Sequence, residues 1–347
     1  MNKPVRLNSL ATAVPEHVFT QHKVSEILKE AYAPVFPHFN QALPVIFNAE
    51  IDTRHTGIPE DWLREDYSFE KRNDIAVESS INLGEEVTRL CLERAGMESD
   101  EIGGIILVTS TALAMPSIDA MIVERMGLRR NILRLPIFGL GCVGGTVGLA
   151  RAAMMARAEP GMRVLLLVIE HNIGTFWKGD LTKQRFIAGV LFGDGAAGAI
   201  VSCEGEGPVI AGWGEHTWPD SLDFSAWKFM DGGFCVLFSR KIPVYAGERL
   251  SAAVNEYLES QNLSHDDIDA YVLHPGGRRV IDAIGAAMKR IPEEDINRSK
   301  EIMREYGNMS APTVLFVLER TLAQKSGRFL LAALGPGFTA GFVTLEV

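Results

Sequence analysis

Hydrophobic positions along the chain fall into short apolar runs that alternate with longer amphipathic stretches. The runs RVLLLVIE, beginning at Arg163, and RFLLAALG, beginning at Arg328, have the length of buried strands. The segments GCVGGTVGLARA around Cys142 and GNMSAPTVLFVLE around Asn308 each place a glycine turn before an apolar helical stretch. This alternation of strand-like and helix-like runs predicts an α/β fold.

The second half of the chain repeats the order of the first. Asn308 holds the place that Cys142 holds earlier, at an offset of 308 − 142 = 166, and the two strand-like runs are 328 − 163 = 165 residues apart. Upstream, GMESDEIGGIILVTS matches NLSHDDIDAYVLHPG when Met97 is set on Leu263, at 263 − 97 = 166. A period of this length indicates two related half-domains rather than a solenoid of small repeats.

The composition predicts that the two halves share one core. The chain has 347 residues, 47% of them hydrophobic, and no Pro/Ser-rich or low-complexity linker divides it. We therefore predict an N-terminal half over residues 1–205 and a C-terminal half over residues 206–347, packed against each other.

Charge and cysteine content argue against several classes of protein. A net charge of −10 and a pI near 5.4 argue against nucleic-acid binding. The uncharged run over residues 135–150 is 16 residues long and rich in glycine, too short for a membrane span. Four cysteines without a pairing pattern, and an N-terminal segment without a signal-peptide apolar region, predict a cytoplasmic protein without disulfides.

Cys142 is the candidate nucleophile. It directly precedes an apolar helical stretch, so we expect the free N–H groups and the positive end of the helix dipole to favour its thiolate. A thiolate attacks carbonyl carbon. We expect Cys91, Cys203 and Cys235 to be small apolar filling, a role that buried cysteines often have.

His274 and Asn308 are candidates to act beside this thiol. His274 ends the strand-like run AYVLHPGG, and open α/β sheets bind ligands at the carboxyl ends of strands. Asn308 precedes a helix, where an asparagine also serves as a simple N-cap. If the two halves are related by pseudo-twofold symmetry, their turns bring Cys142, His274 and Asn308 to one pocket.

Several motifs together resemble one enzyme family. GCVGG, FGDGAA from Phe192, HPGG from His274, EYGNMSAPTVLFVLE from Glu305 and the GPG at Gly335 are similar, in order and spacing, to the type III polyketide synthases. These are the chalcone-synthase-like branch of the thiolase superfamily, and the resemblance runs essentially end to end. It implies a thiolase-like five-layered αβαβα fold built from two duplicated halves, and a homodimer.

The resemblance also implies a reaction. Cys142 would take a starter acyl group from an acyl-CoA as a thioester, and His274 would keep that cysteine ionised. His274 and Asn308 would hydrogen-bond the thioester oxygen of malonyl-CoA and stabilise the enolate formed as carbon dioxide leaves. The enolate would attack the acyl-Cys142 carbonyl. Neither a metal nor another cofactor is implied.

Residues that shape the substrate pocket follow from the same resemblance. Phe192 matches one of two gate phenylalanines, and Val236 stands where the second is expected, although a one-residue slip would place Cys235 there. A small residue at this gate predicts a long fatty acyl starter and an alkylpyrone or alkylresorcinol product. Met115 matches a methionine that reaches across the dimer interface, with ordinary core packing as the alternative.

Further polar residues are expected near the pocket. The resemblance places Ser110 and Thr175 on the cavity wall and gives Ser310 a role in supporting the catalytic asparagine. Asp194 precedes a glycine and is expected to form a turn. Glu170 ends a buried strand and is expected to join a hydrogen-bond network.

The coenzyme A site departs from the family pattern. Plant members hold the nucleotide phosphates with basic residues just before the segment that reads IDTRHTGI here, but this chain has NQALPVIFNAE. We consider Arg54, Arg278 and Arg279 as candidate CoA-binding cations, with a solvated basic patch as the alternative for all three.

Three other functions use some of the same features. An initiating ketoacyl synthase of fatty-acid synthesis has the same three residue types, but it normally shows His-Gln-Ala-Asn in place of HPGG and needs an acidic acyl carrier protein, which a chain of charge −10 attracts poorly. A papain-like hydrolase fits the spacing 274 − 142 = 132 but not the GCVGG signature. A catalytically silent, dimeric interaction protein would not need the Cys, His and Asn set.

Overall fold

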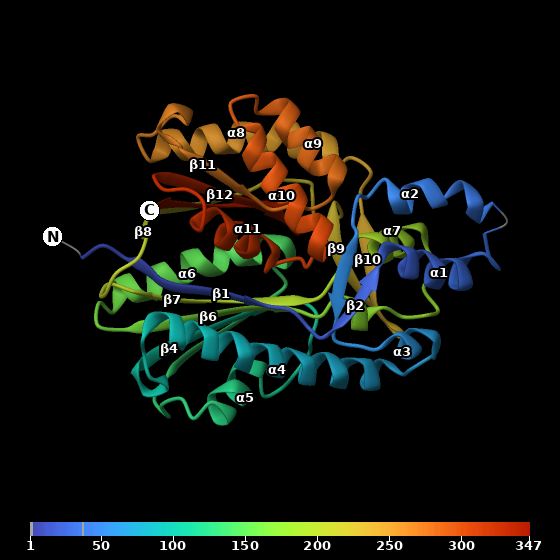
Figure 1. Cartoon of the computed structure of the whole chain (residues 1–347), viewed down its shortest axis with the longest axis horizontal. Coiled ribbons are helices and arrows are strands. Elements are labelled where there is room, and N and C mark those ends of the chain that lie inside the picture. Colours follow the sequence, from blue (N-terminus) through green and yellow to red (C-terminus); the bar gives the residue numbers. More distant parts are fainter. Residues whose placement is uncertain (1–2, 37) are drawn as a thin grey trace.

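The computed structural model describes residues 3–36 and 38–347 and has nine strands in one hydrogen-bonded order. That order is β11-β12-β13-β8-β1-β7-β6-β4-β5. A single residue pair, Arg6 with Val209, joins β1 to β8. The strands therefore divide at this point into two stacked sheets (Figure 1). The bounds are β1 (Arg6–Ala13), β4 (Ile102–Thr109), β5 (Leu133–Phe138), β6 (Arg163–Glu170), β7 (Gly195–Ser202), β8 (Val209–Thr217), β11 (Ala270–Leu273), β12 (Arg328–Gly335) and β13 (Thr339–Glu346).

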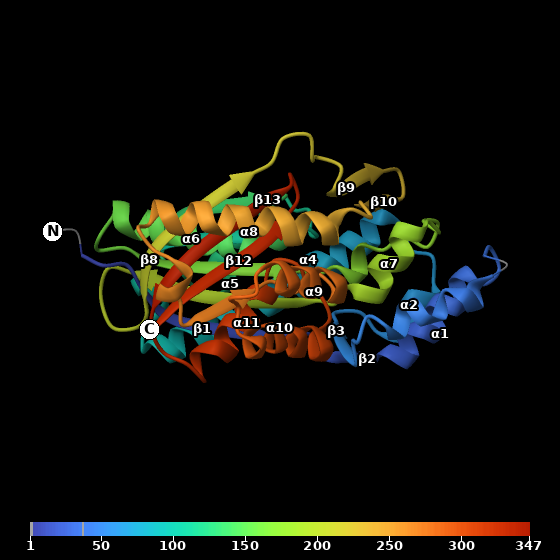
Figure 2. The ribbon, with the colours of Figure 1, turned by 90° about the horizontal axis from the view of Figure 1, so that it is seen from above.

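Helices cover both outer faces of the sheets and fill the space between them. Figure 1 shows α4 and α5 below the lower sheet, α6 and α11 between the sheets, and α8 and α9 above the upper sheet. Viewed from above, α8 runs across β12 and β13 (Figure 2). This arrangement is the predicted five-layered αβαβα fold. The bounds are α4 (Phe69–Ala95), α5 (Ile118–Arg125), α6 (Gly144–Ala158), α8 (Ile242–Ser260), α9 (Arg278–Ala287), α10 (Glu293–Tyr306) and α11 (Thr313–Leu322).

The layering explains the apolar sequences of the central elements. The strand β6 reads RVLLLVIE and is buried on both faces, so it shows no polar alternation. The helix α6 lies between the sheets and is built largely from Gly and Ala, which let it pack closely on both. Separate hydrophobic clusters fill the middle layer and the two outer layers.

The internal duplication is visible in the register of the strands. Ile105 on β4 pairs with Leu165 on β6, and Tyr271 on β11 pairs with Leu330 on β12, both in parallel. These partners are related by 271 − 105 = 166 and 330 − 165 = 165, the offsets predicted from the sequence. Each duplicated pair is then extended by an antiparallel strand, β7 beside β6 and β13 beside β12. The predicted division at residue 205 stays a prediction.

Smaller elements gather at one end of the sheets, on the right of Figure 1. These elements are the helices α1 (Gln21–Tyr32), α2 (Leu43–Phe47), α3 (Glu60–Arg64) and α7 (Lys183–Leu191), and the hairpins β2 (His17–Thr20) with β3 (Thr53–Thr56) and β9 (Ser225–Met230) with β10 (Gly233–Phe238). Short 3-10 turns complete the chain at η1 (Phe39–Gln41), η2 (Ser99–Glu101), η3 (Gly141–Val143), η4 (Ile173–Thr175) and η5 (His265–Asp267).

Within the described residues, no helix combines the length and apolar character needed to cross a membrane.

Candidate active site

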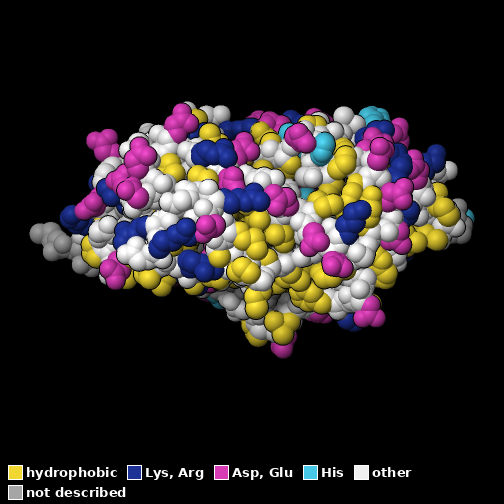
Figure 3. Space-filling model, turned by 90° about the horizontal axis from the view of Figure 1, so that it is seen from below, with side chains coloured by type: hydrophobic (Ala, Val, Ile, Leu, Met, Phe, Trp, Pro, Cys, Tyr) yellow, Lys and Arg dark blue, Asp and Glu magenta, His cyan; other side chains and the backbone are white. Residues whose placement is uncertain are grey.

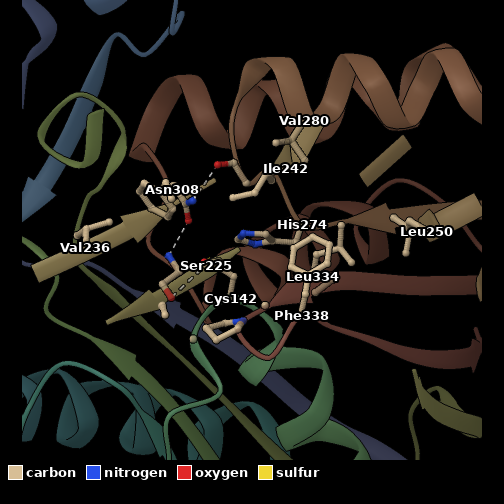
Figure 4. Close-up of a pocket in the computed structure, with 18 of the residues that line it drawn as sticks. Cys142, Ser225, Val236, Ile242, Leu250, His274, Val280, Asn308, Leu334 and Phe338 are labelled. Atoms are coloured by element: carbon tan, nitrogen blue, oxygen red, sulfur yellow. Dashed lines mark hydrogen bonds between the residues drawn. The ribbon is translucent and has the colours of Figure 1, made fainter. Parts of the chain in front are cut away.

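Three turns from separate parts of the chain carry Cys142, His274 and Asn308 to one cavity. Cys142 lies in η3 directly before α6, His274 directly follows β11, and Asn308 lies between α10 and α11. All three line a cavity of about 840 Å³ that opens to solvent. Figure 4 shows their side chains around this cavity. The structure thus brings together the three residues that the sequence singled out.

The turn of Cys142 approaches the turn of Asn308 closely because Gly145 has no side chain. A Cβ atom on Gly145 would lie 2.3 Å from the backbone oxygen of Ala311 and 2.8 Å from Cγ1 of Val314. Either contact would push α6 away from α11. Gly145, the last residue of the GCVGG motif, therefore allows the two duplicated turns to lie side by side.

Hydrogen bonds fix the orientation of the Asn308 amide. Its Oδ1 accepts a hydrogen bond from the Ser310 backbone N–H at 2.8 Å. Its Nδ2 donates to the Gly276 backbone oxygen at 3.2 Å. An amide nitrogen carries two donors, so one N–H remains for a ligand in the cavity. The two hydrogen bonds therefore hold the Asn308 amide in place, and the cap of α11 is Pro312 rather than Asn308.

Burial favours the protonated form of the Cys142 thiol. Burial raises the pKa of Cys142 to about 11, and the nearby Glu170 carboxyl raises it further, whereas hydrogen bonds with Ser310 and Asn308 lower it. The Sγ atom lies 3.6 Å from the Ser310 hydroxyl oxygen. The sequence-based expectation of a resting thiolate was therefore wrong. The helix begins where expected, but loss of hydration outweighs its dipole.

His274 is neutral for the same reason. Burial lowers its pKa to about 3, and only 5% of the residue is exposed. Neither ring nitrogen has a hydrogen-bond partner among the described residues. Burial thus works against the expected pairing of a His274 cation with a Cys142 thiolate. A neutral ring offers one N–H donor and one acceptor, and both are available to a substrate.

The hairpin β9–β10 forms one wall of the cavity. Val236 and Phe238 line the cavity, and because side chains alternate along a strand, Cys235, which directly precedes Val236, faces the other side. Val236 pairs directly with Trp227 on β9, which lines the same cavity. The Phe192 ring lies 6.3 Å from that of Trp227 and 5.9 Å from that of Phe238, centroid to centroid. Val236, and not Cys235, therefore lies on the cavity wall, next to Trp227 and Phe238.

Comparisons with known proteins agree with this site. Residues 2–205 match the family model of chalcone and stilbene synthases, N-terminal domain. The chain belongs to the chalcone and stilbene synthase family. It is a bacterial-type type III polyketide synthase, an acyltransferase that forms carbon–carbon bonds. Residues 258–347 of this polyketide synthase match the C-terminal model of 3-oxoacyl-[acyl-carrier-protein] synthase III.

Relatives of this polyketide synthase extend over almost the whole chain. The 1,3,6,8-tetrahydroxynaphthalene synthase of Streptomyces peucetius is 32% identical over 96% of this chain and 91% of its own. The phloroglucinol synthase of Pseudomonas fluorescens is 28% identical over 94% of each chain. The crystal structure of the tetrahydroxynaphthalene synthase of Streptomyces coelicolor, a bacterial type III polyketide synthase, gives a TM-score of 0.93 at 28% identity, covering 98% of this chain and 99% of that one. These comparisons support neither the ketoacyl synthase nor the hydrolase alternative.

Two residues expected on the cavity wall lie behind it. Ser110 is buried, and its Oγ accepts a hydrogen bond from the Gly141 backbone N–H at 3.0 Å. The Thr175 hydroxyl is also buried and donates to the Asn172 backbone oxygen at 2.6 Å. Neither residue belongs to the described lining of the cavity, so this expectation was wrong. Ser110 instead supports the turn that carries Cys142.

The acidic residues near the site join hydrogen-bond networks. Glu170 accepts from the Ser110 backbone N–H at 3.0 Å and from the Thr111 hydroxyl at 2.7 Å, and burial raises its pKa to about 7. Asp194 accepts from the backbone N–H groups of Gly57 and Ile173, so it ties together distant segments and is more than a turn former. Within the described ranges, no three His, Cys, Asp or Glu residues are grouped as metal ligands.

The structure contradicts the prediction that Arg54 binds coenzyme A. Arg54 is 1% exposed, and its guanidinium donates to the backbone oxygens of Gly189, Val190 and Phe192. It also contacts the Gln21 side chain. Arg54 therefore holds the end of α7 in front of the gate residue and cannot bind a phosphate at the surface. The sequence placed it near the site but could not show its burial.

The other two cations lie at the start of α9, close to Gly276 and Val280 of the cavity lining. Arg278 forms ion pairs with Glu50 and with Asp282, the latter at 2.8 Å. Arg279 is exposed and forms no ion pair with the described residues. Of the three candidates, Arg279 is therefore the cation most available to a phosphate.

Trp227 and Phe238 are pocket residues that the sequence analysis missed. A signal for Trp227 was present, because the Asp231-Gly232 step between two apolar runs is typical of a two-residue hairpin loop. That loop sets Trp227 opposite Val236. Phe238 follows from the two-residue period of β10 once Val236 is placed on the cavity face.

Proposed function

We propose that this enzyme condenses malonyl-CoA with a starter acyl group carried by Cys142. The observation that carries this proposal is the position of Cys142, His274 and Asn308 on one cavity whose other walls are mostly apolar. In the first step the neutral His274 ring accepts the Cys142 proton, and the sulfur attacks the acyl-CoA carbonyl. The new S–C bond forms as the bond to coenzyme A breaks, and the proton passes to the departing CoA thiolate.

His274 and Asn308 act together as hydrogen-bond donors to the extender unit, malonyl-CoA. The free N–H of Asn308 and one N–H of His274 bind the thioester oxygen of malonyl-CoA. When carbon dioxide leaves, negative charge develops on this oxygen, and donors already in position stabilise it. The enolate carbon then attacks the acyl-Cys142 carbonyl, and the Cys142 sulfur departs. The lengthened chain is now bound to coenzyme A and can return for another round or cyclise.

The starter that fits the cavity best is a long fatty acyl chain, leading to an alkylpyrone or alkylresorcinol. The cavity is also lined by Ile242 and Leu250 from α8 and by Val280 from α9 (Figure 4). Each methylene that leaves water for such a wall contributes about 0.8 kcal/mol to binding. Val236 leaves more room at the gate than a phenylalanine, although Trp227 takes part of that space.

A chain-length series tests this proposal. The purified enzyme is incubated with malonyl-CoA and acyl-CoA starters from acetyl to stearoyl, and the products are identified by mass spectrometry. The proposal predicts that kcat/KM rises with chain length until the apolar part of the cavity is filled. Equal activity with acetyl-CoA and palmitoyl-CoA would refute the long-chain starter while leaving the condensation itself intact.

We also propose that two copies of the chain form a dimer through the edge strand β5. Leu133, Leu135 and Phe138 on this strand are 40% to 50% exposed, and Met115 nearby is fully exposed. The Phe138 ring lies 6.5 Å from that of Phe229 on β9, which continues the apolar surface. Figure 3 shows hydrophobic side chains gathered along the lower edge of that view.

A surface of this kind fits a self-complementary partner, because monomers rarely expose so many large apolar side chains together. The exposure of Met115 excludes the alternative of core packing and supports its reach toward a partner. Light scattering after gel filtration should give a dimer, and Leu135→Glu should shift it toward monomer.

Coenzyme A is proposed to lie across the start of α9. Arg279, which is exposed, and Arg278, which must share its charge with two carboxylates, would contact the phosphates. Arg279→Ala should raise KM for acyl-CoA with little change in kcat. Because coenzyme A thioesters are intracellular metabolites, we propose that the enzyme works in the cytoplasm.

A further inference from the structure

A second cavity lies on the other side of the hairpin β9–β10. Its open volume is about 560 Å³, and its walls come from α1, the segment after α3, the start of α4, and α7. Strand β10 separates it from the catalytic cavity. Val236 lines the catalytic cavity, whereas the Cys235 thiol faces Asp180, which lines the second one.

Two arginines line this cavity without an ionic partner. Arg72 is 3% exposed, and its guanidinium bonds the Gly232 backbone oxygen, but its Nε has no partner among the described residues. The Nε and Nη1 atoms of Arg185 are also buried and unpartnered within the described chain. No described carboxylate forms an ion pair with either guanidinium.

These two cations are unusual in energetic terms. A buried charge without a counter-charge costs several kcal/mol, so buried guanidinium groups are normally paired. Burial lowers the pKa of Arg185 to about 10, which still leaves it charged at pH 7. The Phe176 ring, whose centroid lies 3.3 Å from Arg185 Cζ, stabilises this cation only in part.

The charges around the cavity are unevenly placed. Asp180 is 5% exposed, accepts a hydrogen bond from the Thr182 backbone N–H at 3.1 Å, and leaves its Oδ2 without a described partner. The interior therefore carries two positive charges and one negative charge. The exposed rim carries Glu65, Asp66 and Lys178, and the Asp66 carboxylate is near enough to Arg72 to raise its pKa against the effect of burial. The inner wall thus has an excess positive charge that a single anionic group would neutralise.

The rest of the wall is apolar and aromatic. The rings of Trp62 and Tyr67 stack at 4.7 Å between centroids, and Leu28 and Leu181 lie on the same cavity. Such walls favour an apolar ligand body over a hydrated inorganic anion. A guanidinium fork also matches the two oxygens of a carboxylate.

We propose that this second cavity binds a small carboxylate with an apolar body, whose head group pairs with Arg72 and Arg185. The site is separate from the catalytic cavity, and its ligand need not be a substrate. Arg185 lies in the helix α7, which ends at Leu191, the residue before Phe192, so a ligand here would contact the helix that leads to Phe192.

Calorimetric titration of the full chain tests the proposal with a matched pair of probes. We expect 4-phenylbutyrate to bind and its neutral amide, 4-phenylbutyramide, to bind at least about tenfold more weakly, because only the acid forms charge-assisted bonds. Inorganic phosphate should bind more weakly than the acid. Equal affinity for acid and amide, or tighter binding of phosphate, would overturn the proposal without the need for any variant.

Variants then locate the site. Arg185→Met and Arg72→Met should each weaken 4-phenylbutyrate binding at least about tenfold. The matched control is Arg89→Met on the same helix as Arg72, where the arginine side chain is 63% exposed. Val236→Phe, at a residue that lines the catalytic cavity, should leave this affinity unchanged. If Val236→Phe removes binding while Arg185→Met does not, the probe occupies the catalytic cavity and the proposal is wrong.

Discussion

Val236 and Trp227 face each other across the hairpin β9–β10 and line the same cavity. A small side chain on one strand is thus matched by the largest side chain on the other. In antiparallel strands such directly opposed residues share space, so the size of one limits the room left by the other. The width of the cavity at the gate depends on this pair rather than on Val236 alone.

Changing the size of either side chain in the Val236–Trp227 pair should therefore change which acyl-CoA starter the enzyme prefers. Val236→Phe should shift the preference toward shorter acyl-CoA starters, because the added ring fills space beside Trp227. Trp227→Ala should shift it toward longer or bulkier starters. The measurement is kcat/KM across the acyl-CoA series. Cys235→Ala, on the opposite face of the same strand, is the matched control, and an unchanged profile in Val236→Phe would contradict this account of the gate.

The variant Cys142→Ala should lose polyketide formation and keep its fold. The substitution removes the nucleophile but only one buried sulfur atom, so the free energy of unfolding should change by about 1 kcal/mol. Release of carbon dioxide from malonyl-CoA should continue, because His274 and Asn308 remain. Product formation by chromatography and thermal unfolding by circular dichroism check these two parts. Any polyketide made by this variant would refute the covalent mechanism.

The variant Asn308→Ala should separate the two half-reactions. Loss of one oxyanion donor typically costs about 3 kcal/mol in the barrier, or a few hundredfold in rate. Decarboxylation of malonyl-CoA should fall by this amount, whereas acylation of Cys142 by the starter should fall much less. Single-turnover measurements of each step decide the point. If both rates drop equally, Asn308 does not act mainly on the extender.

Stability should depend on pH through Glu170. Its pKa is raised from 4.5 to about 7 in the folded protein, so folding favours the protonated form. The contribution to stability is present below pH 4.5 and is lost as the pH rises through 7. Each pKa unit corresponds to 1.36 kcal/mol, so this loss amounts to about 3 kcal/mol. Glu170→Gln should remove that part of the pH dependence in denaturant unfolding, and an unchanged pH profile would show that Glu170 is ionised throughout.

Much of the fold could be predicted from the sequence because the duplication is strong. The offsets of 166 and 165 recur in the paired residues of β4 with β6 and β11 with β12. The same repetition led to Cys142 and Asn308, which occupy equivalent turns. Local patterns of this kind survive in the sequence because each half must bury the same faces.

Other features of the site could not be predicted from the sequence, because they depend on burial and on contacts between distant segments. The position of Arg54 in the sequence is compatible with a phosphate ligand, but its guanidinium donates hydrogen bonds to backbone oxygens of α7. The pKa of Cys142 could not be predicted from the helix that follows it, because desolvation by the surrounding layers has the opposite effect. Ser110 and Thr175 lie beside cavity residues in the fold yet point away from the cavity.

The central claim is that Cys142 carries the starter acyl group as a thioester. The most direct test is to incubate the wild-type enzyme with palmitoyl-CoA alone, without malonyl-CoA, and to measure the intact protein mass and the modified peptide. The account predicts a mass increase of one palmitoyl group, located on the peptide that contains Cys142 and released by later addition of malonyl-CoA. An unmodified protein, or a palmitoyl group on Cys235 instead of Cys142, would contradict it.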